Sequence, residues 1–319
     1  MLERVVGALN KASSILILFH ESPDGDAVAS SLALGMALEQ KKKKVDYICR
    51  DPIPKVFSFL PGIEKIRKDC LLGDYDIVCT VDCGDVRRTG FAERVKEYSK
   101  HRTLINIDHH LKNDLHKIAT INFTNDKVAA SAELVFEIIK ALNAKMNRDM
   151  ATLVLTGLYT DTGGFQHSNT CPRVYALASR LMSYGARLNK ISQNIALNKR
   201  LSCLKLWGLA LSRIKKNSYG IVTSYVTSAD FEKFGANLDD LAGVVNIINS
   251  TPNAKATMLF AEQGDGTIKA SIRTESNVID ICKIARLFGG GGHKKAAGFT
   301  LKGRIIDGKK SGWSIDLTS

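Results

Sequence analysis

The N-terminal third of the chain alternates short apolar runs with helical stretches, and acidic or imidazole side chains follow several of the runs. Runs that are apolar at successive positions are typical of strands buried on both faces of a sheet. The strands expected in this part are 14–20, 45–49, 77–81, 103–107 and 118–123. Because a helical pattern over 26–40 and further helical stretches alternate with these strands, we predict an α/β fold built on a mostly parallel sheet.

The remaining pattern predicts a second, smaller α/β domain. A length of 319 residues suits two domains at about 150 residues each. We expect an N-terminal domain over 1–187, a helical linker over 188–212 and a C-terminal domain over 213–319. Helices complete the first domain at 132–142, 150–159 and 174–182. In the second, strands are expected at 219–226, 256–261 and 267–272, helices at 238–248 and 278–288, and an apolar stretch at 296–301.

Composition narrows the classes of protein that fit. The 45 Lys and Arg exceed the 32 Asp and Glu, and the shorter second part is the more basic. That balance suits a polyanionic ligand such as a nucleotide or nucleic acid, with solubility alone as the alternative. No apolar run approaches the roughly 18 residues of a membrane span, so a cytoplasmic protein without a membrane partner is expected. The seven Cys contain no C-x-x-C pair, which favours reduced thiols over disulfides or a zinc ribbon.

Acids and histidines gather where the predicted strands end. The side chains concerned are His20, Asp24, Asp26, Asp82, Asp108, His109, His110 and, after the helix at 150–159, Asp161. Ligands of open α/β sheets bind beyond the carboxyl ends of the strands, so we expect these side chains to converge. Taken alone, Asp24-Gly25-Asp26 is compatible with a turn and a helix cap, and Asp82 with a surface residue. The complete ordered set favours a functional site.

Such a set of carboxylates needs compensating cations. Carboxylates at close range raise one another's pKa values, and bound divalent metal ions neutralise their charge. Oxygen ligands mixed with a few imidazoles suit Mn²⁺ better than the zinc of thiolate-rich structural sites. Two such ions about 3.5–4 Å apart are a recognised arrangement for phosphoryl chemistry.

A glycine run marks the second domain. Gly290, Gly291 and Gly292 precede His293, and Arg273 ends a predicted strand upstream. Backbone N–H groups of glycines can approach an anion closely because no Cβ intrudes. A flexible turn is the alternative, but the neighbouring His293 and Arg273 favour a clamp for a phosphate or a base.

Taken in order, these motifs resemble the DHH phosphoesterase superfamily. His20-Glu-Ser-Pro-Asp24-Gly-Asp26 matches its first motif, Val81-Asp82 the second, Asp108-His109-His110 the third and Asp161-Thr-Gly-Gly-Phe165 the fourth. The stretch 289–299 resembles the signature of the DHH-associated C-terminal domain. Length and two-domain plan are most similar to the NrnA-type oligoribonucleases, which include 3′-phosphoadenosine 5′-phosphate phosphatases. Two features depart from the pattern: His167 stands where many relatives carry a basic residue, and the tail 302–319 has no motif.

The resemblance implies a site with two Mn²⁺, for which Mg²⁺ or Co²⁺ could substitute. It implies metal ligands in two sets, His20 and Asp24 for one ion and Asp26, His109 and Asp161 for the other, with Asp82 as the bridge. His110 would face the substrate phosphate and Asp108 would orient the histidines. Arg88 falls where relatives have a phosphate-facing arginine.

The activity so implied is metal-dependent hydrolysis of short RNA or DNA oligonucleotides to nucleoside monophosphates, together with 3′,5′-bisphosphonucleosides. Short substrates are expected because a pocket between two linked domains admits only a few nucleotides. A cyclic-dinucleotide phosphodiesterase is an alternative. The Gly-Gly-Gly-His signature argues against a pyrophosphatase, and the complete set of ligand types argues against a non-catalytic nucleotide-binding module. The sequence leaves open whether the chain forms a homodimer.

Overall fold

The structure is a computed structural model that describes residues 1–110, 114–197, 199–276, 278–292, 294–308 and 312–317. The chain forms two units, Met1–Asn198 (unit 1) and Lys199–Ser319 (unit 2), which are described separately. The segment expected as a helical linker divides at this boundary. Helix α8 (Leu188–Ser192) and a π-turn (Gln193–Leu197) belong to unit 1, whereas α9 (Leu201–Ser212) packs in the core of unit 2.

The described part of unit 1 contains one parallel sheet. Its strands are β1 (Ser14–Phe19), β2 (Lys44–Ile48), β3 (Ile66–Arg67), β4 (Ile77–Val81), β5 (Thr103–Asp108) and β6 (Ile121–Thr124). They lie in the order β3-β2-β1-β4-β5-β6, and all the pairings among these described strands are parallel. The α/β prediction is therefore confirmed. The last strand was expected to begin at 118, but α4 (Leu115–Ile118) ends there and β6 starts three residues later.

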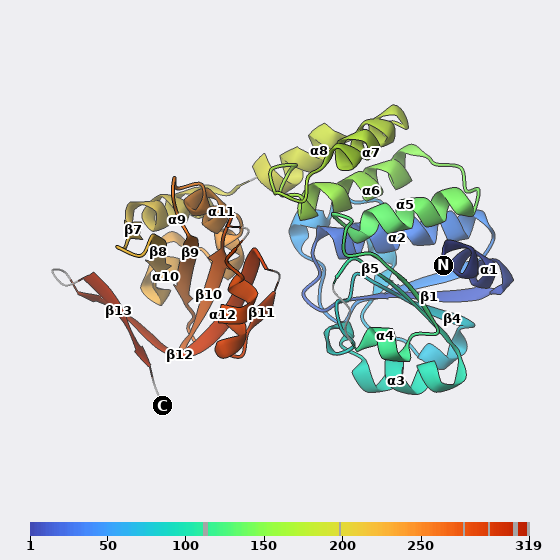
Figure 1. Cartoon of the computed structure of the whole chain (residues 1–319), viewed down its shortest axis with the longest axis horizontal. Coiled ribbons are helices and arrows are strands. Elements are labelled where there is room, and N and C mark those ends of the chain that lie inside the picture. Colours follow the sequence, from blue (N-terminus) through green and yellow to red (C-terminus); the bar gives the residue numbers. More distant parts are fainter. Residues whose placement is uncertain (111–113, 198, 277, 293, 309–311, 318–319) are drawn as a thin grey trace. The chain divides into compact units, whose positions relative to one another are not determined.

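Helices cover both faces of this sheet. The other helices of the described part are α1 (Leu2–Lys11), α2 (Gly25–Gln40), α3 (Ala92–His101), α5 (Ser131–Ala141), α6 (Arg148–Asp161) and α7 (Pro172–Ser183), with 3₁₀ turns at Lys55–Phe57, Ile63–Lys65, Leu72–Asp74 and Arg87–Thr89. In Figure 1, α2, α5 and α6 lie on one face and α3 and α4 on the other. Two separate apolar clusters fill the two faces.

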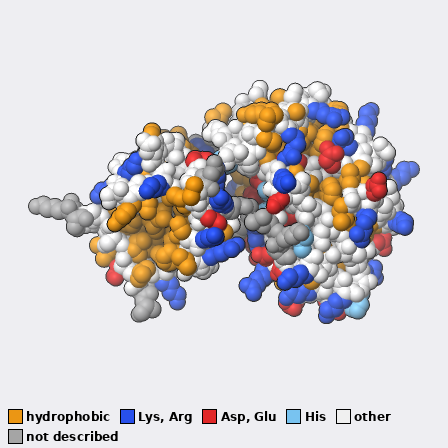
Figure 2. All heavy atoms as spheres, in the orientation of Figure 1, with side chains coloured by type: hydrophobic (Ala, Val, Ile, Leu, Met, Phe, Trp, Pro, Cys, Tyr) orange, Lys and Arg blue, Asp and Glu red, His pale blue; other side chains and the backbone are white. Residues whose placement is uncertain are grey.

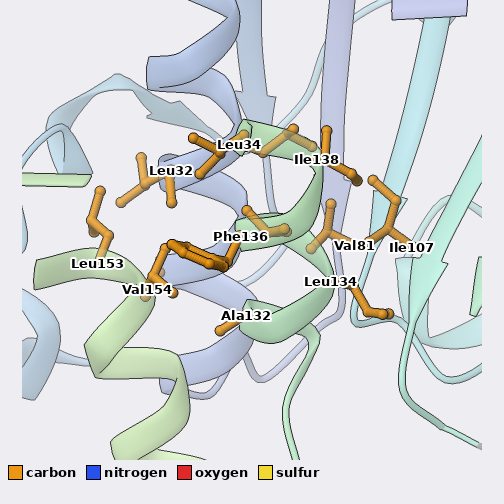
Figure 3. Close-up of a cluster of buried hydrophobic side chains, with 14 of the residues drawn as sticks. Leu32, Leu34, Val81, Ile107, Ala132, Leu134, Phe136, Ile138, Leu153 and Val154 are labelled. Atoms are coloured by element: carbon orange, nitrogen blue, oxygen red, sulfur yellow. The ribbon is translucent and has the colours of Figure 1, made fainter. Parts of the chain in front are cut away.

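Helix α2 lies at the centre of the larger cluster. Its residues from Gly25 to Gly35 are all buried, because the sheet, α5 and α6 surround it. Figure 3 shows Leu32 and Leu34 of α2 beside Phe136 of α5 and Val154 of α6. Each fully buried Leu or Phe contributes about 1.5–3 kcal/mol to the free energy of folding. The packing therefore fixes the beginning of α2, which carries two of the predicted site residues.

Unit 2 is built on a mixed sheet. Its strands are β7 (Lys215–Lys216), β8 (Ile221–Val226), β9 (Ala256–Glu262), β10 (Thr267–Arg273), β11 (Gly291–Gly292), β12 (Ala296–Gly308) and β13 (Gly312–Leu317), with helices α9, α10 (Ser228–Phe234), α11 (Val244–Asn249) and α12 (Ile281–Leu287) and a 3₁₀ turn at Leu238–Leu241. The order is β11-β12-β10-β9-β8-β7, and β13 pairs with β12. The single helix expected over 238–248 is wrong. Gly243 has φ +97° and interrupts it, so that α11 begins only at Val244.

In the tail without a motif, the described residues form two paired strands, called here the hairpin. Strand β12 continues past the main sheet and pairs with β13 over residues 303–308 and 312–317. Trp313 of this hairpin packs against Tyr225 and Phe260, with ring centroids 5.1 and 5.2 Å away. The hairpin thereby covers part of the apolar cluster of unit 2.

Figure 2 shows one face of each unit, with the side chains coloured by type. On the face shown in Figure 2, Lys and Arg side chains are spread over both units, and a broad apolar area lies on unit 2. Among the described residues, none of the helices combines the length and apolar character that crossing a membrane would need.

Candidate active site

The predicted site residues of unit 1 meet where the strand order reverses. After β1 the chain proceeds to β2 and β3 on one side, and it later returns to place β4, β5 and β6 on the other. His20 follows β1, Asp82 follows the adjacent β4, and Asp108 ends β5. A reversal of this kind opens a crevice at the carboxyl ends of the strands.

Three overlapping groups of side chains there have the composition of a metal site. Within each group, the candidate ligand atoms lie within 4.8 Å of one another. The groups are His20, Asp24 and Asp82; Asp26, His109 and Asp161; and Asp82, His109 and His110. Asp82 and His109 belong to two groups each, so the sites form one connected cluster.

Asp82 lies at the centre of this cluster. Its Oδ1 is 3.4 Å from His109 Nε2, and its Oδ2 is 4.0 Å from His20 Nε2. Its φ of +58° is in the left-handed region, which non-glycine residues seldom adopt. The strained turn directs the carboxylate so that its two oxygens face different histidines.

His20 presents a nitrogen that suits a cation. Its Nδ1 donates a hydrogen bond to the carbonyl of Glu21 at 2.6 Å, so Nε2 carries the lone pair of the neutral ring. Nε2 is buried and makes no hydrogen bond among the described residues. It lies 3.6 Å from Asp24 Oδ2, beyond hydrogen-bond distance. A buried acceptor beside carboxylates is otherwise costly, and a shared metal ion would satisfy both.

Asp24 has a position that is compatible with both interpretations that the sequence left open. Its Oδ1 accepts hydrogen bonds from the backbone N–H groups of Asp26 and Ala27, at 3.1 and 3.0 Å, and so caps α2. Its Oδ2 faces His20. The cap therefore fixes the orientation of the oxygen that lies in the cluster.

Asp26 is buried and receives three hydrogen bonds. Ser30 Oγ donates at 2.7 Å, and the backbone N–H groups of Ser131 and Ala132 donate at 2.5 and 3.0 Å. Burial, and then the negative charges of Asp82 and Asp161, raise the pKa of Asp26 well above its usual value. The first turn of α5 thus stabilises a carboxylate that its surroundings otherwise disfavour.

Asp161 ends α6 and faces His109. Its Oδ2 lies 3.2 Å from His109 Nε2. Burial, partly offset by the hydrogen bond with His109, raises the pKa of Asp161 to about 6. Burial alone would lower the pKa of His109, but Asp161 and Asp82 raise it well above its usual value. Both shifts have the direction expected where acids and an imidazole lie close together without a compensating cation, and the donor set of the cluster fits divalent metals.

Asp108 and His110 form a pair beside this cluster. Asp108 accepts from Gly84 N at 2.7 Å, His110 N at 2.9 Å and His110 Nδ1 at 2.6 Å. Burial raises the pKa of a carboxyl, but these hydrogen bonds lower that of Asp108 to about 2. A Cβ added to Gly84 would lie 2.7 Å from Arg88 Nη1 and 3.6 Å from His110 Cδ2, so both side chains flank this glycine. Arg87, the alternative to Arg88, is exposed.

Unit 2 carries the other predicted residues. Arg273 Nε donates to Asn246 Oδ1 at 3.0 Å, which orients its guanidinium, and burial lowers its pKa. Gly290 and Gly292 lie where any Cβ would collide with β12, whereas Gly291 has open space. The close approach of Gly290 and Gly292 to β12 gives two of the three glycines a packing reason, and the anion contact that we expected stays a prediction. His293 lies outside the described residues.

A small pocket adjoins this glycine turn. Its volume is about 370 Å³, and its lining is Lys269, Phe288, Gly289, Gly290, Gly291, Gly298, Phe299 and Thr300. Phe288 stacks on Phe299 with ring centroids 4.5 Å apart and is half exposed. The pocket thus offers an aromatic face and one cation.

Sequence reasoning missed Ser131. Its backbone N–H donates to Asp26, and its hydroxyl donates to Asp82 Oδ1 at 2.9 Å. The available signal was the run of small residues Ala129-Ala130-Ser131-Ala132 at the start of a helix, a composition that permits close approach to other backbone and side-chain atoms.

Comparisons with known proteins agree with this geometry. Residues 14–158 match the DHH family, N-terminal domain, and residues 218–310 match the DHHA1 domain. The bifunctional oligoribonuclease and PAP phosphatase NrnA of Thermus thermophilus is 31% identical over 95% of this chain and 90% of that protein. NrnA of Bacillus subtilis is 24% identical over 94% and 93%. An exopolyphosphatase-related protein from Bacteroides fragilis has a crystal structure that superposes with a TM-score of 0.86 at 27% identity, covering 93% of this chain and 90% of that one.

The motifs follow one another in the expected order, and the two matched domains together cover most of the sequence. The resemblance inferred from His20, Asp82, Asp108 and Asp161 is thereby confirmed. The chain therefore belongs to the DHH family of phosphoesterases and is an enzyme that hydrolyses phosphoester bonds.

Proposed function

We propose that this enzyme uses two divalent ions to hydrolyse short oligonucleotides to nucleoside monophosphates. The observation that carries the proposal is the pair of ligand groups on either side of Asp82, one containing His20 and the other lying around His109. Oxygen and imidazole donors together favour Mn²⁺, with Mg²⁺ or Co²⁺ as substitutes.

The proposed ligands divide into two sets that share one carboxylate. One ion would be held by His20, Asp24 and Asp82, and the other by Asp26, His109, Asp161 and Asp82. When bound, two such ions supply an activated water and neutralise the charge of the phosphate. Asp82 and Asp26 would fix the spacing of the ions, because hydrogen bonds from α5 hold both carboxylates.

Two side chains beside the ions would act on the substrate phosphate, and a third would position one of them. Asp108 accepts a hydrogen bond from His110 Nδ1 and so fixes the orientation of the ring, which would face the non-bridging oxygens of the phosphate. Arg88, which flanks the same glycine as His110, would add a cation. Asp108 is a positioning residue in this scheme, because it acts through His110.

Unit 2 would bind the rest of the nucleotide. Arg273 would contact a phosphate, and the pocket beside Gly290 and Gly291 would take a base against Phe288, since stacking on an aromatic face tolerates any base. For Gly292 and His293, contact with the substrate remains a sequence-based prediction. The curated relatives named as NrnA are bifunctional oligoribonucleases and PAP phosphatases, which favours 3′,5′-bisphosphonucleosides as a second substrate.

A substrate panel tests this proposal. Metal-stripped enzyme would be assayed with and without Mn²⁺ on a dinucleotide, a 3′,5′-bisphosphonucleoside, a cyclic dinucleotide and pyrophosphate. We expect Mn²⁺-dependent turnover of the first two and the highest kcat/KM for the dinucleotide. Full activity without metal would refute the two-ion scheme, and a preference for pyrophosphate or the cyclic dinucleotide would refute the substrate assignment.

A further inference from the structure

The first turn of α5 contacts two carboxylates that lie far apart in the sequence. Ser131 donates its backbone N–H to Asp26 Oδ2 and its hydroxyl to Asp82 Oδ1. Its side chain is fully buried. One residue of α5 therefore connects α2 with the end of β4, the elements that carry these two acids.

The two hydrogen bonds of Ser131 differ in what they control. Asp26 also accepts from Ser30 Oγ and Ala132 N, so its orientation does not depend on Ser131 alone. The Asp82 carboxylate accepts a hydrogen bond from a hydroxyl group, and that hydroxyl belongs to Ser131. Because this bond ends on Oδ1, it fixes the rotation of the group and leaves Oδ2 directed toward His20.

We infer that Ser131 is a positioning residue that holds the Asp82 carboxylate in the orientation needed to serve both metal positions. The inference rests on the proposed two-ion function. The two Asp82 oxygens face different histidines of the two proposed ligand sets, so rotation about the Cβ–Cγ bond would move both oxygens away from these sets at once. The Ser131 hydroxyl opposes that rotation in the metal-free protein and so pre-forms the bridge.

The packing around Ser131 prevents α5 from following a displaced carboxylate. Ala130 and Ala132 on either side are fully buried. A Cβ added to Gly157 of α6 would lie within 3.0 Å of both Asp26 Oδ1 and Ala132 Cβ, so α5, α6 and Asp26 are in close contact. The position of the hydroxyl is therefore set by the packing of helices and not by the ions.

Metal binding by the intact, metal-stripped protein tests this role without substrate. Mn²⁺ would be titrated into the wild type, Ser131→Ala and Ser31→Ala, and free Mn²⁺ would be read from its EPR signal. Ser31 is a matched control, since it is also a fully buried serine and its hydroxyl makes no hydrogen bond among the described residues. We expect the wild type and Ser31→Ala to bind two ions alike, and Ser131→Ala to bind both about 10–100-fold more weakly.

Ser131→Thr keeps the hydroxyl but adds a methyl at a fully buried position, so its melting temperature without Mn²⁺ measures the cost of overpacking. If it melts like the wild type, its affinity for Mn²⁺ should also lie close to that of the wild type. Wild-type affinity in Ser131→Ala, or an equal loss of affinity in Ser131→Ala and in a Thr variant that melts like the wild type, would overturn the inference. If Ser131→Ala does not fold, Ser131→Cys replaces it with the same expected loss, because a thiol is a much weaker donor than a hydroxyl.

The result also distinguishes this inference from the proposed function. Two ions bound by both the wild type and Ser131→Ala with equal affinity would refute the role of Ser131 and leave the two-ion site intact. A wild type that binds no Mn²⁺ would refute the two-ion proposal and this inference with it. Melting temperatures measured with and without Mn²⁺ give a second readout, since the stabilisation by the ions should shrink in Ser131→Ala alone.

Discussion

Gly157 of α6 allows a direct test of how closely the helices surround the acidic cluster. A Cβ at this position would lie within 3.0 Å of Asp26 Oδ1 and of Ala132 Cβ. Neither neighbour can yield easily, because Asp26 accepts hydrogen bonds from the start of α5 and Ala132 belongs to that same turn. The substitution Gly157→Ala would therefore force Asp26 or α5 to move.

Two opposing effects set how much Gly157→Ala changes the free energy of unfolding of unit 1. Within a helix, Ala is more favourable than Gly by about 1 kcal/mol. Overpacking a filled interior costs about 1–3 kcal/mol, and two contacts this short place Gly157→Ala in the upper part of that range. The free energy of unfolding of unit 1 should thus fall by about 1–2 kcal/mol. For a unit of this size, that corresponds to a loss of about 2–8 °C in Tm.

Gly7 in α1 provides the matched control. A Cβ there would meet nothing within 4 Å, so Gly7→Ala should raise the stability by up to about 1 kcal/mol. Both variants would be melted without metal and assayed on a dinucleotide. We expect about a tenfold or greater loss of kcat/KM in Gly157→Ala, as for other losses of support around a metal ligand, and none in Gly7→Ala. A Gly157→Ala enzyme that is stabilised and fully active would refute the close packing around Asp26.

Asp82→Asn should reduce hydrolysis more than Asp108→Asn, because a shared ligand serves both ions whereas a positioning partner typically contributes about 10–100-fold; equal losses in kcat/KM would contradict this assignment. Since the pKa of Asp161 is raised to about 6, its contribution to the stability of the metal-free fold is present below about pH 4 and lost as the pH rises through 6. The melting temperature should record this loss in the wild type and not in Asp161→Asn, and stabilisation by Mn²⁺ should grow over the same interval. Trp313→Ala should lower the free energy of unfolding of unit 2 by about 2 kcal/mol. This is less than the loss of about 3–5 kcal/mol for a fully buried Trp, because Trp313 is half-buried. An unchanged urea unfolding curve would show that the hairpin does not stabilise unit 2.

Local patterns were sufficient to predict the elements that carry the site. The apolar runs that became β1, β4 and β5 are buried, and they are neighbours in one parallel sheet. The cap at Asp24 marks the beginning of α2. Such signals are local, because burial on both faces excludes polar side chains from a strand and a cap needs only the next three residues.

Other features had no local signal of comparable strength. The break at Gly243 depends on a left-handed backbone within an otherwise helical pattern, and the hairpin at Trp313 depends on an apolar face formed by distant strands. The glycine run suggested an anion contact, which stays a prediction, and the sequence did not show that the close approach of β12 requires glycine at Gly290 and Gly292. In each of these cases, residues from elsewhere in the chain decide the conformation.

The sequence by itself determined the residue types of the cluster and the strand ends on which they lie, because each motif is contained in a few consecutive residues. Only the tertiary structure decided that Ser131 donates to Asp26, 105 residues away, and to Asp82, 49 residues away. It also decided that the two oxygens of Asp82 face different histidines. These contacts depend on how α2, α5 and α6 pack on the sheet, and packing is a property of the whole unit that periodicity within a single element does not contain.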